Sequence, residues 1–235
     1  MKTFKNIISA VYPNKCMCCG EIIYENKSFC DYCESKIQRN NLESLCLDCG
    51  YEKSDCVCNY NIYRFKKLVT VFKNEGVAQK AYYNYKFNKR EHYAHFFAKE
   101  MSLAIQKLFD ISDIDFICAV PTARGFIKNT QYNHSGYIAM QISKNLNIPF
   151  VNGVLYCAKN KKMQHKSSLK ERLTNVEGKY AFKARIDGKK ILLVDDIRTT
   201  GATLDECSKV LLYAGADEVY CVTALATIIN SKKVN

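Results

Sequence analysis

The chain has 235 residues, 48% of them hydrophobic, enough for one medium-sized α/β domain and a small additional module. It has no run of about 18 apolar residues, and its apolar segment at 7–11 is shorter than a signal-peptide core of about 7–15 residues, so we expect a cytoplasmic protein without membrane insertion. The net charge of +12 is concentrated in residues 61–190, which favours polyanionic partners such as phosphates or nucleic acid. A solvated basic surface is the alternative interpretation.

Cysteine dominates the first 60 residues. Nine of the 13 cysteines precede residue 59, mostly in close pairs. In a chain without an export signal, such pairs favour metal ligation over disulfide bonds. The remaining four are scattered along the chain, and we expect them in or near the core as small hydrophobic residues: Cys118, Cys157, Cys207 and Cys221.

An internal repeat organises these cysteines. The sequence Cys-Met-Cys-Cys-Gly at 16–20 recurs as Cys-Leu-Asp-Cys-Gly at 46–50, and a second cysteine pair follows each copy. Two Cys-x-x-Cys pairs form a tetrahedral four-sulfur zinc site, so the spacing predicts one or two structural Zn²⁺ ions. The predicted ligands are Cys16, Cys19, Cys30 and Cys33, and then Cys46, Cys49, Cys56 and Cys58. A cross-braced pairing or a single site stays open, and Cys18 is left over because Gly20 directly follows Cys19. We interpret residues 1–60 as a double zinc-ribbon module and residues 61–235 as a second domain.

The next elements are a strand at 66–72, a turn at 74–76, a helix at 77–85 and a second helix at 95–109. Aromatic and basic residues alternate around the first helix: Tyr82, Tyr83, Tyr85 and Phe87 with Lys80, Lys86, Lys89 and Arg90. Aromatic platforms between basic groups suit single-stranded nucleic acid. The same aromatic residues would also suit a buried core, so both interpretations stand.

The middle of the chain alternates strands, a helix and basic loops. We expect a strand at 116–120, a basic loop to 129, a helix at 134–147 and a strand at 151–155. The segment 159–175 is polar and carries six Lys or Arg against one acid, which predicts a functional or disordered loop.

The stretch 191–203 is the most informative part of the sequence. Four apolar residues at 191–194 predict a strand that is buried on both faces, as in a parallel sheet. Two acids follow where that strand should end, and small residues lead from them into a helix: Asp195 and Asp196, then Thr199, Thr200, Gly201, Ala202 and Thr203. Ligands bind at the carboxyl ends of such strands, and a helix N-terminus favours anions. The stretch therefore predicts a phosphate cradle beside two acids, against the alternative of an ordinary strand–turn–helix joint. A strand at 219–225 completes a βαβ unit.

This stretch resembles the phosphoribosyl pyrophosphate (PRPP) motif of type I phosphoribosyltransferases, in the form found in the ComF/ComFC family of competence-associated proteins. That family also has an N-terminal double zinc ribbon. The resemblance implies an α/β fold: a type I phosphoribosyltransferase-like parallel sheet flanked by helices and preceded by a small Cys-rich zinc-ribbon module. It also implies that Asp195 and Asp196 are catalytic residues that contact the ribose hydroxyls, and that residues 199–203 hold the 5′-phosphate.

The resemblance places further site residues in the basic middle of the chain. Pyrophosphate candidates are Lys86, Arg124 and Lys128, Mg²⁺ would accompany PRPP, and a flexible loop with Gln164, Lys166 and Arg172 would close over it. One departure concerns catalysis, because Thr130-Gln131 stands where relatives have an Arg-Gly pair. Turnover is therefore left open, with pentosyl transfer as the expected reaction class of an active enzyme.

Three functions follow from these features. The first is a ComF-type protein that binds PRPP and single-stranded DNA and acts in DNA uptake and natural transformation. Its implied partners are a competence helicase and proteins that load single-stranded DNA. The second is a nucleotide-salvage phosphoribosyltransferase, and the third is a non-catalytic adaptor that binds nucleic acid or protein. The zinc ribbon favours the first or the third, and the complete di-acid motif argues against a vestigial site.

Overall fold

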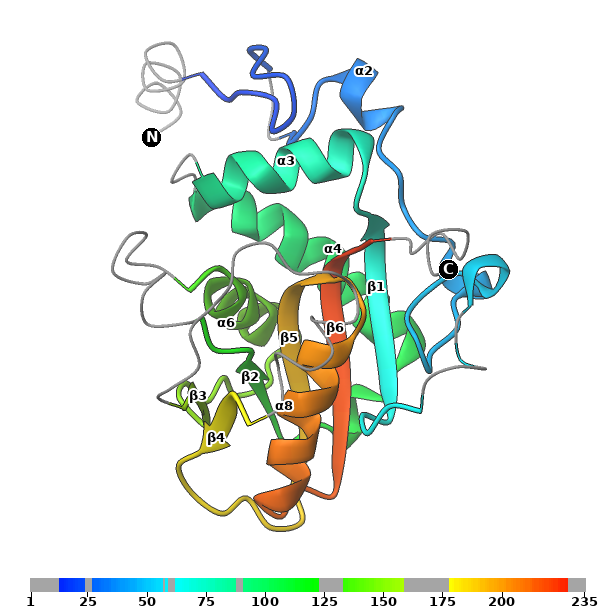
Figure 1. Ribbon diagram of the computed structural model, residues 1–235. Coiled ribbons are helices and arrows are strands. Elements are labelled where there is room, and N and C mark those ends of the chain that lie inside the picture. Colours follow the sequence, from blue (N-terminus) through cyan, green and yellow to red (C-terminus); the bar gives the residue numbers. More distant parts are fainter. Residues whose placement is uncertain are drawn as a thin grey trace.

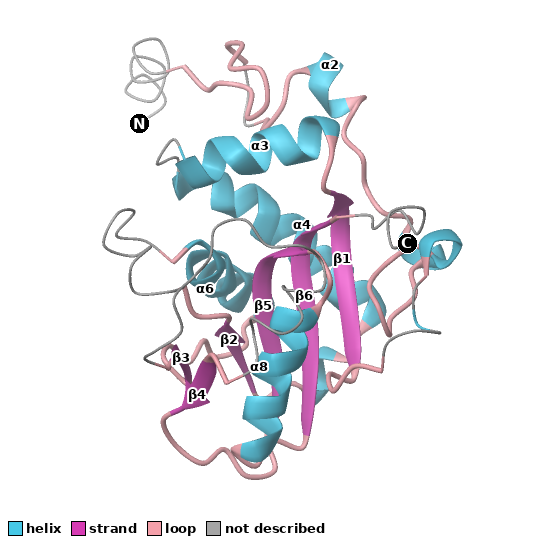
Figure 2. Cartoon of the chain, in the orientation of Figure 1, coloured by secondary structure: helices cyan, strands magenta, loops and turns pink. Residues whose placement is uncertain are grey.

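The computed structural model describes residues 13–23, 27–56, 58, 62–87, 91–122, 133–158 and 178–227. A four-stranded parallel sheet lies at its centre, with the strand order β1-β6-β5-β2 (Figures 1 and 2). A separate antiparallel pair, β3 and β4, lies beside it. The strands are β1 (Lys67–Lys73), β2 (Phe116–Ala119), β3 (Leu155–Cys157), β4 (Tyr180–Phe182), β5 (Lys190–Arg198) and β6 (Glu218–Ala226). The predicted parallel α/β fold is confirmed.

Helices cover both faces of the sheet. One face packs against α4 (Ala94–Leu108) and α6 (His134–Leu146), with α3 (Gly76–Phe87) above them, and the other face packs against α8 (Ala202–Tyr213) (Figure 1). The short helix α2 (Asp31–Glu34) belongs to the Cys-rich region, and 3₁₀ turns lie at Leu42–Ser44, Lys53–Asp55, Glu91–Tyr93 and Ile111–Asp113. Within the described ranges, no helix combines the length and the apolar character needed to cross a membrane.

The strand predicted at 191–194 is completely buried. Leu192 and Val194 belong to the core under α4 and α6, whereas Ile191 and Leu193 belong to the core under α8. All four side chains have 0% exposure. This alternation explains the unbroken apolar run, because a strand covered on both faces has no solvent side.

β5 is longer than the sequence predicted. We expected it to end before Asp195, but it continues through both acids to Arg198. The reason is an unequal pairing of its two edges: β2 accompanies β5 only as far as Val194, while β6 pairs with it up to Arg198. The two acids therefore lie on a strand that is paired on one side and has passed the end of its neighbour on the other.

A second prediction was wrong, because residues 151–155 do not form a strand. Gly153 has a φ of +77° and makes a turn, so the strand begins only at Leu155 and pairs antiparallel with β4 outside the main sheet. The other predicted helices and strands match the structure to within about two residues.

The helix α8 ends in a Schellman cap. The Gly215 N–H donates to the carbonyl of Leu212 at 3.0 Å, and the Ala216 N–H donates to that of Leu211 at 3.1 Å.

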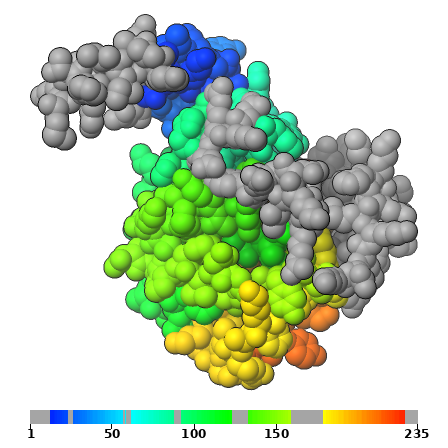
Figure 3. All heavy atoms as spheres, turned by 90° about the vertical axis from the view of Figure 1, so that its left-hand side faces the viewer, coloured from blue at the N-terminus to red at the C-terminus, as the bar shows by residue number. Residues whose placement is uncertain are grey.

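The Cys-rich region packs against the α/β domain along much of its length. Its first part lies over α3 at one end of the molecule (blue in Figures 1 and 3). Its connecting segment runs antiparallel to the outer edge of β1, where Asn40 donates to Val71 at 2.8 Å and Lys73 donates to Gln38 at 3.0 Å. This segment covers an edge strand that would otherwise expose its backbone.

Candidate functional site

The eight predicted ligands form two separate groups of four cysteines. The sulfur atoms within each group lie within 4.8 Å of one another, and the members are Cys16, Cys19, Cys30 and Cys33 in the first group and Cys46, Cys49, Cys56 and Cys58 in the second. Consecutive pairs therefore combine, so the cross-braced and single-site alternatives are wrong. The buried Cys18 belongs to neither group.

The sulfur separations fit zinc. They are 3.8 Å for Cys19–Cys30, and 3.5 Å and 3.8 Å for Cys46–Cys58 and Cys49–Cys56. A tetrahedral ion with Zn–S bonds of about 2.3 Å has S···S edges of about 3.8 Å. The two groups support structural zinc, which would hold each ribbon together without a large core.

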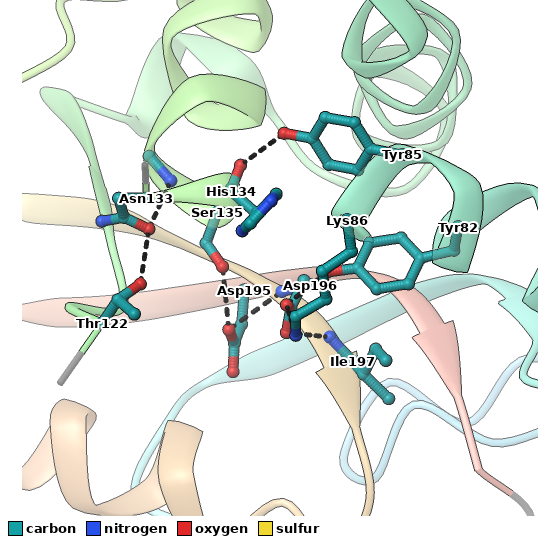
Figure 4. A network of polar contacts seen from close by, with 11 residues as sticks. Tyr82, Tyr85, Lys86, Thr122, Asn133, His134, Ser135, Asp195, Asp196 and Ile197 are labelled. Atoms are coloured by element: carbon teal, nitrogen blue, oxygen red, sulfur yellow. Dashed lines mark hydrogen bonds and ion pairs between the residues drawn. The ribbon is translucent and has the colours of Figure 1, made fainter. Parts of the chain in front are cut away.

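Asp195 is the more deeply enclosed of the two acids. It is 7% exposed, and its Oδ1 accepts hydrogen bonds from the Ser135 hydroxyl at 3.1 Å and from the Asp196 backbone N–H at 2.9 Å (Figure 4). Burial, and then the neighbouring charge of Asp196, raise the pKa of Asp195 to about 8. Its surroundings therefore favour the protonated form of this carboxyl group more than water would.

Asp196 has the opposite electrostatic environment. Burial alone would raise its pKa, but the charge of Lys86 and several hydrogen bonds outweigh burial and lower it. The donors are the Tyr82 hydroxyl, the Lys86 ammonium at 3.0 Å and the N–H of Ile197 at 2.7 Å. Two adjacent carboxylates avoid double ionisation, so the pair carries one negative charge, and Lys86 balances it.

Two helices bring these partners to the acids (Figure 4). Tyr82 and Lys86 are four residues apart on α3 and share a face, with the Lys86 ammonium 5.6 Å from the centre of the Tyr82 ring. From the other side comes Ser135, in the first turn of α6. That turn is capped by Asn133, whose Oδ1 accepts from the Gly136 N–H at 3.1 Å and also from a threonine hydroxyl of the loop after β2.

His134 packs beside this arrangement at the start of α6. Its ring lies edge-on to Tyr85 with 5.2 Å between ring centres, and its carbonyl accepts from the Tyr85 hydroxyl at 3.0 Å. Burial, followed by the charge of Lys86, lowers the pKa of His134. These contacts give His134 a structural role at the start of α6.

The predicted phosphate loop follows β5. Gly201 has a φ of +84° and is the N-cap of the 12-residue helix α8. A Cβ at this position would lie 3.0 Å from Cε1 of Tyr63. A residue other than glycine would also have a strained backbone at this positive φ, so glycine is strongly favoured here. The Ala202 N–H donates to the Thr200 hydroxyl at 3.3 Å. A helix N-terminus with small hydroxyl residues is suited to bind a phosphate.

Three residues that the sequence did not indicate hold this loop from outside. The Tyr51 hydroxyl lies 2.9 Å from the carbonyl oxygen of Thr199, and the Tyr63 hydroxyl donates to that of Thr200 at 3.0 Å. The buried Arg198 guanidinium stacks over the Tyr51 ring, 3.7 Å from its centre. Tyr51 directly follows a Cys-x-x-Cys-Gly knuckle, but nothing local in the sequence indicates a contact 148 residues away.

The structure thus brings part of the predicted site together. Both acids, residues 199–203 and Lys86 lie at the carboxyl end of β5. The remaining predicted residues lie outside the described ranges: Arg124, Lys128, Gln164, Lys166 and Arg172, together with Thr130 and Gln131.

Comparison with known proteins agrees with this site and with the cysteine groups. The family model of the phosphoribosyl transferase domain matches residues 97–234. The chain belongs to this family. A second model, that of the double zinc ribbon domain, matches residues 7–60, so this phosphoribosyltransferase-domain protein has the two parts expected for the ComF type.

Curated relatives of this phosphoribosyltransferase-domain protein have names connected with DNA. Competence protein F of Haemophilus influenzae is 33% identical over 91 residues, which cover 37% of this chain and 40% of that protein. The chain thus matches less than half of that relative. DNA utilization protein YhgH of Escherichia coli is 23% identical over 221 residues, or 89% of this chain and 96% of the relative.

Solved structures include phosphoribosyltransferases with low sequence identity. The purine phosphoribosyltransferase of Pyrococcus horikoshii is 16% identical and aligns over 57% of this chain and 75% of its own, with a TM-score of 0.34. The adenine phosphoribosyltransferase of Thermoanaerobacter pseudethanolicus is 13% identical over 59% of this chain and 83% of its own, also with a TM-score of 0.34.

Proposed function

We propose that this protein binds PRPP with Mg²⁺ at the carboxyl end of β5 and acts in the uptake and use of DNA, as the names of its curated relatives suggest. The observation that carries the proposal is that a buried acid, a partly buried acid, one lysine and a helix N-terminus capped by Gly201 meet at one edge of the sheet. A ribose phosphate has matching groups, because its hydroxyls bind carboxylates and its phosphate binds helix N–H groups.

Each residue has a role in this proposal. Asp195 and Asp196 hold the ribose hydroxyls, and the ionised Asp196 favours the positive charge that develops on the ribose when the bond from C1 to pyrophosphate breaks. Lys86, now paired with Asp196, turns to the leaving pyrophosphate when ribose hydroxyls take its place. Arg124, Lys128 and the segment 159–175 stay predictions for the pyrophosphate side and for closure. Turnover is tested separately, by release of pyrophosphate with candidate acceptors.

Calorimetric titration with PRPP and Mg²⁺ tests the site. We expect wild-type binding and a large loss in the Asp195→Asn/Asp196→Asn double variant. The matched control is Asp217→Asn, an exposed acid just before β6, at the opposite end of the strands. Equal binding by the wild type and the double variant would move the site elsewhere, and absence of binding by the wild type would remove the proposal.

A second part of the proposal concerns single-stranded DNA. The core interpretation of the aromatic residues on α3 holds for Tyr82 and Tyr85, which are fully buried. Tyr83 and Phe87 are 45% and 58% exposed and stack on each other, with ring centres 5.7 Å apart and planes 15° apart. Exposed stacked rings next to a basic segment are suited to bind unpaired bases.

Fluorescence anisotropy with a labelled single-stranded oligonucleotide tests this surface. Replacing Tyr83 and Phe87 by alanine should weaken binding by about tenfold or more, because base stacking contributes about 1–3 kcal/mol per base. The slope of affinity against salt should stay the same because no charge is removed. Tyr213→Ala, a 73% exposed tyrosine on α8, is the control. Equal affinities of the two variants would contradict the stacking role.

The two other functions make different predictions. A nucleotide-salvage enzyme would release pyrophosphate with a free nucleobase and would not need DNA. A non-catalytic adaptor would bind DNA and leave PRPP unbound.

We also propose that the boundary between the two domains lies between residues 60 and 61. We propose a cytoplasmic location as well, because reduced, metal-binding cysteines are typical of reducing compartments.

A further inference from the structure

The second zinc ribbon is joined to the phosphate loop by direct contacts. Its knuckle places Tyr51, since the Cys46 N–H donates to the Tyr51 carbonyl and the Gly50 N–H to the Cys46 carbonyl, both at 2.7 Å. The knuckle is in turn attached to β1, because the Leu68 N–H donates to the Leu47 carbonyl at 2.6 Å. The backbone of Tyr51 is therefore held by a metal-ligand turn on one side and by the sheet on the other.

The Tyr51 side chain reaches the point where β5 and β6 end. Its hydroxyl lies 2.9 Å from the Thr199 carbonyl oxygen and 2.6 Å from that of Thr227, so its one hydrogen lies between the ends of two neighbouring strands. The Tyr51 ring forms a small apolar cluster with Cys49 and Ala226. One buried side chain thus connects the second ribbon, the end of β6 and the first residue of the phosphate loop.

Arg198 extends this connection. It is 1% exposed, and its guanidinium donates to the Thr199 carbonyl at 3.3 Å and to the Tyr63 hydroxyl at 3.2 Å. Its Nε has no hydrogen-bond partner within the described part of the chain. A buried cation needs compensation, and here the face of the Tyr51 ring provides it at 3.7 Å. The buried charge of Arg198, the last residue before the loop, is therefore stabilised by a tyrosine of the second ribbon.

We propose that the second ribbon positions the phosphate loop, with Tyr51, Tyr63 and Arg198 as positioning residues, so that zinc in this ribbon increases the affinity for PRPP. The physical reason is the orientation of two carbonyl groups. The tyrosine hydroxyls bind the carbonyl oxygens of Thr199 and Thr200 and hold them in one orientation. A freed carbonyl oxygen that turned toward the cradle would repel a phosphate. This inference rests on the proposed PRPP site.

The first ribbon provides the internal reference. Its contacts go to α3 and α4: Asn84 donates to the Met17 carbonyl at 2.8 Å, and Phe29 packs edge-on against Phe96 with 4.9 Å between ring centres. Among the described residues, no hydrogen bond or ring contact joins it to residues 199–203. Changes in the first ribbon should therefore leave the loop as it is.

The test compares Tyr51→Phe with Tyr32→Phe, the same change at a 73% exposed tyrosine of the first ribbon. Phenylalanine keeps the ring under Arg198 and removes only the hydroxyl. For each full-length variant we would measure the Kd of PRPP with Mg²⁺ by calorimetry, the bound zinc, and hydrogen exchange of the amides at 199–203. Tyr63→Phe is a second variant, which acts on the Thr200 carbonyl from a position beyond the last cysteine ligand in the sequence.

We expect Tyr51→Phe to keep both zinc ions, to exchange faster at 199–203 and to bind PRPP about five- to tenfold more weakly, the effect of one lost hydrogen bond. Tyr63→Phe should resemble it, and Tyr32→Phe should match the wild type. If Tyr51→Phe and Tyr63→Phe both had the hydrogen exchange and the PRPP affinity of the wild type, the inference would be overturned and the proposed function would stay intact. A wild type that does not bind PRPP would instead remove the proposed function, and exchange at 199–203 would then decide the positioning role by itself.

Discussion

The two zinc ribbons share the Cys-x-x-Cys-Gly knuckle, and in each the four sulfur atoms lie within 4.8 Å of one another, yet they pack against different parts of the molecule. The first packs on α3 and α4, and within the described residues it makes no hydrogen bond or ring contact with residues 199–203. The second packs along β1, and its Tyr51 reaches the phosphate loop. The comparison teaches that the repeat specifies a zinc-bound turn, whereas the surface under that turn decides whether the ribbon can influence a ligand site.

The equivalent glycines show how close each contact is. Gly20 and Gly50 both have a positive φ, +80° and +73°. A Cβ added to Gly20 would meet nothing within 4 Å, whereas one added to Gly50 would lie 2.7 Å from side-chain carbons of Leu68 and Thr70. The second knuckle therefore places its backbone directly on the sheet edge, and the first does not.

Loss of one zinc ligand should give the largest difference. We expect Cys56→Ser and Cys19→Ser, both at exposed ligand positions, to lose one zinc ion each and to lower the melting temperature by about 10 °C or more, since metal binding contributes to folding. Only Cys56→Ser should also increase hydrogen exchange at 199–203. Metal analysis measures the zinc content, scanning calorimetry the melting temperature, and hydrogen exchange the protection of residues 199–203. Wild-type exchange at 199–203 in Cys56→Ser would contradict the proposed difference between the ribbons.

Alanine at the two glycines should give the next largest difference. Gly50→Ala should cost about 2–5 kcal/mol of unfolding free energy, because left-handed strain adds to the overlap with the β1 side chains. Gly20→Ala should cost only the strain, about 1–2 kcal/mol. Urea unfolding of both variants measures the difference, and equal losses would show that the second knuckle is not constrained by the sheet.

Removal of one asparagine at each contact of the Cys-rich region with the α/β domain, Asn40 in the connecting segment or Asn84 on α3, should have a moderate effect. The buried Asn40 donates to the Thr70 carbonyl at 3.0 Å and to its hydroxyl at 2.8 Å, whereas the partly exposed Asn84 donates to the Met17 carbonyl at 2.8 Å. We expect alanine to cost about 2 kcal/mol at position 40 and about 1 kcal/mol at position 84, because an unsatisfied buried group costs more than an exposed one. Urea unfolding of the two variants at equal zinc occupancy tests this order. A larger loss of unfolding free energy at position 84 than at position 40 would contradict it.

The smallest effect concerns charge and pH. The Glu52 carboxylate accepts from the Asn41 N–H at 2.8 Å and pairs with Lys73 at 3.1 Å, and the Asn41 N–H, followed by Lys73, lowers the pKa of Glu52. Because the folded-state pKa is lower than the unfolded value, its stabilisation is present above the unfolded pKa of about 4.3 and is lost as pH falls through the folded pKa.

Glu52→Gln should therefore lose up to about 1 kcal/mol at pH 7, and the difference from the wild type should shrink toward zero below about pH 4. The matched change in the first ribbon is Glu34→Gln, at a surface ion pair with Arg39 in which Glu34 is 48% exposed. We expect it to have almost no effect. Unfolding curves at both pH values decide the prediction, and a Glu52 effect that grew on acidification would contradict it.

Local patterns were sufficient for much of the fold. The apolar run at 191–194 predicted a strand buried on both faces, and the strand has no exposed side chain. The strand's true end was missed because it depends on pairing with β6, which continues to the pair of Arg198 with Ala226, a residue that comes later in the chain. The false strand at 151–155 has a similar cause, since apolar residues around Gly153 resemble a strand until the turn is seen.

By itself, the sequence determined the repeated cysteine pairs, the central strand and the loop from Asp195 to Thr203, because each depends on spacing between near neighbours and on the conformations those residues allow. Which pairs combine was decided by the structure. Only the tertiary structure decided in which direction the pKa of each acid is shifted and which ribbon reaches the loop. Ser135, Tyr82 and Lys86 set the charge of the acids from two different helices. Tyr51 meets Thr199 across 148 positions. Such contacts arise from the packing of whole elements, and no local pattern records how those elements pack.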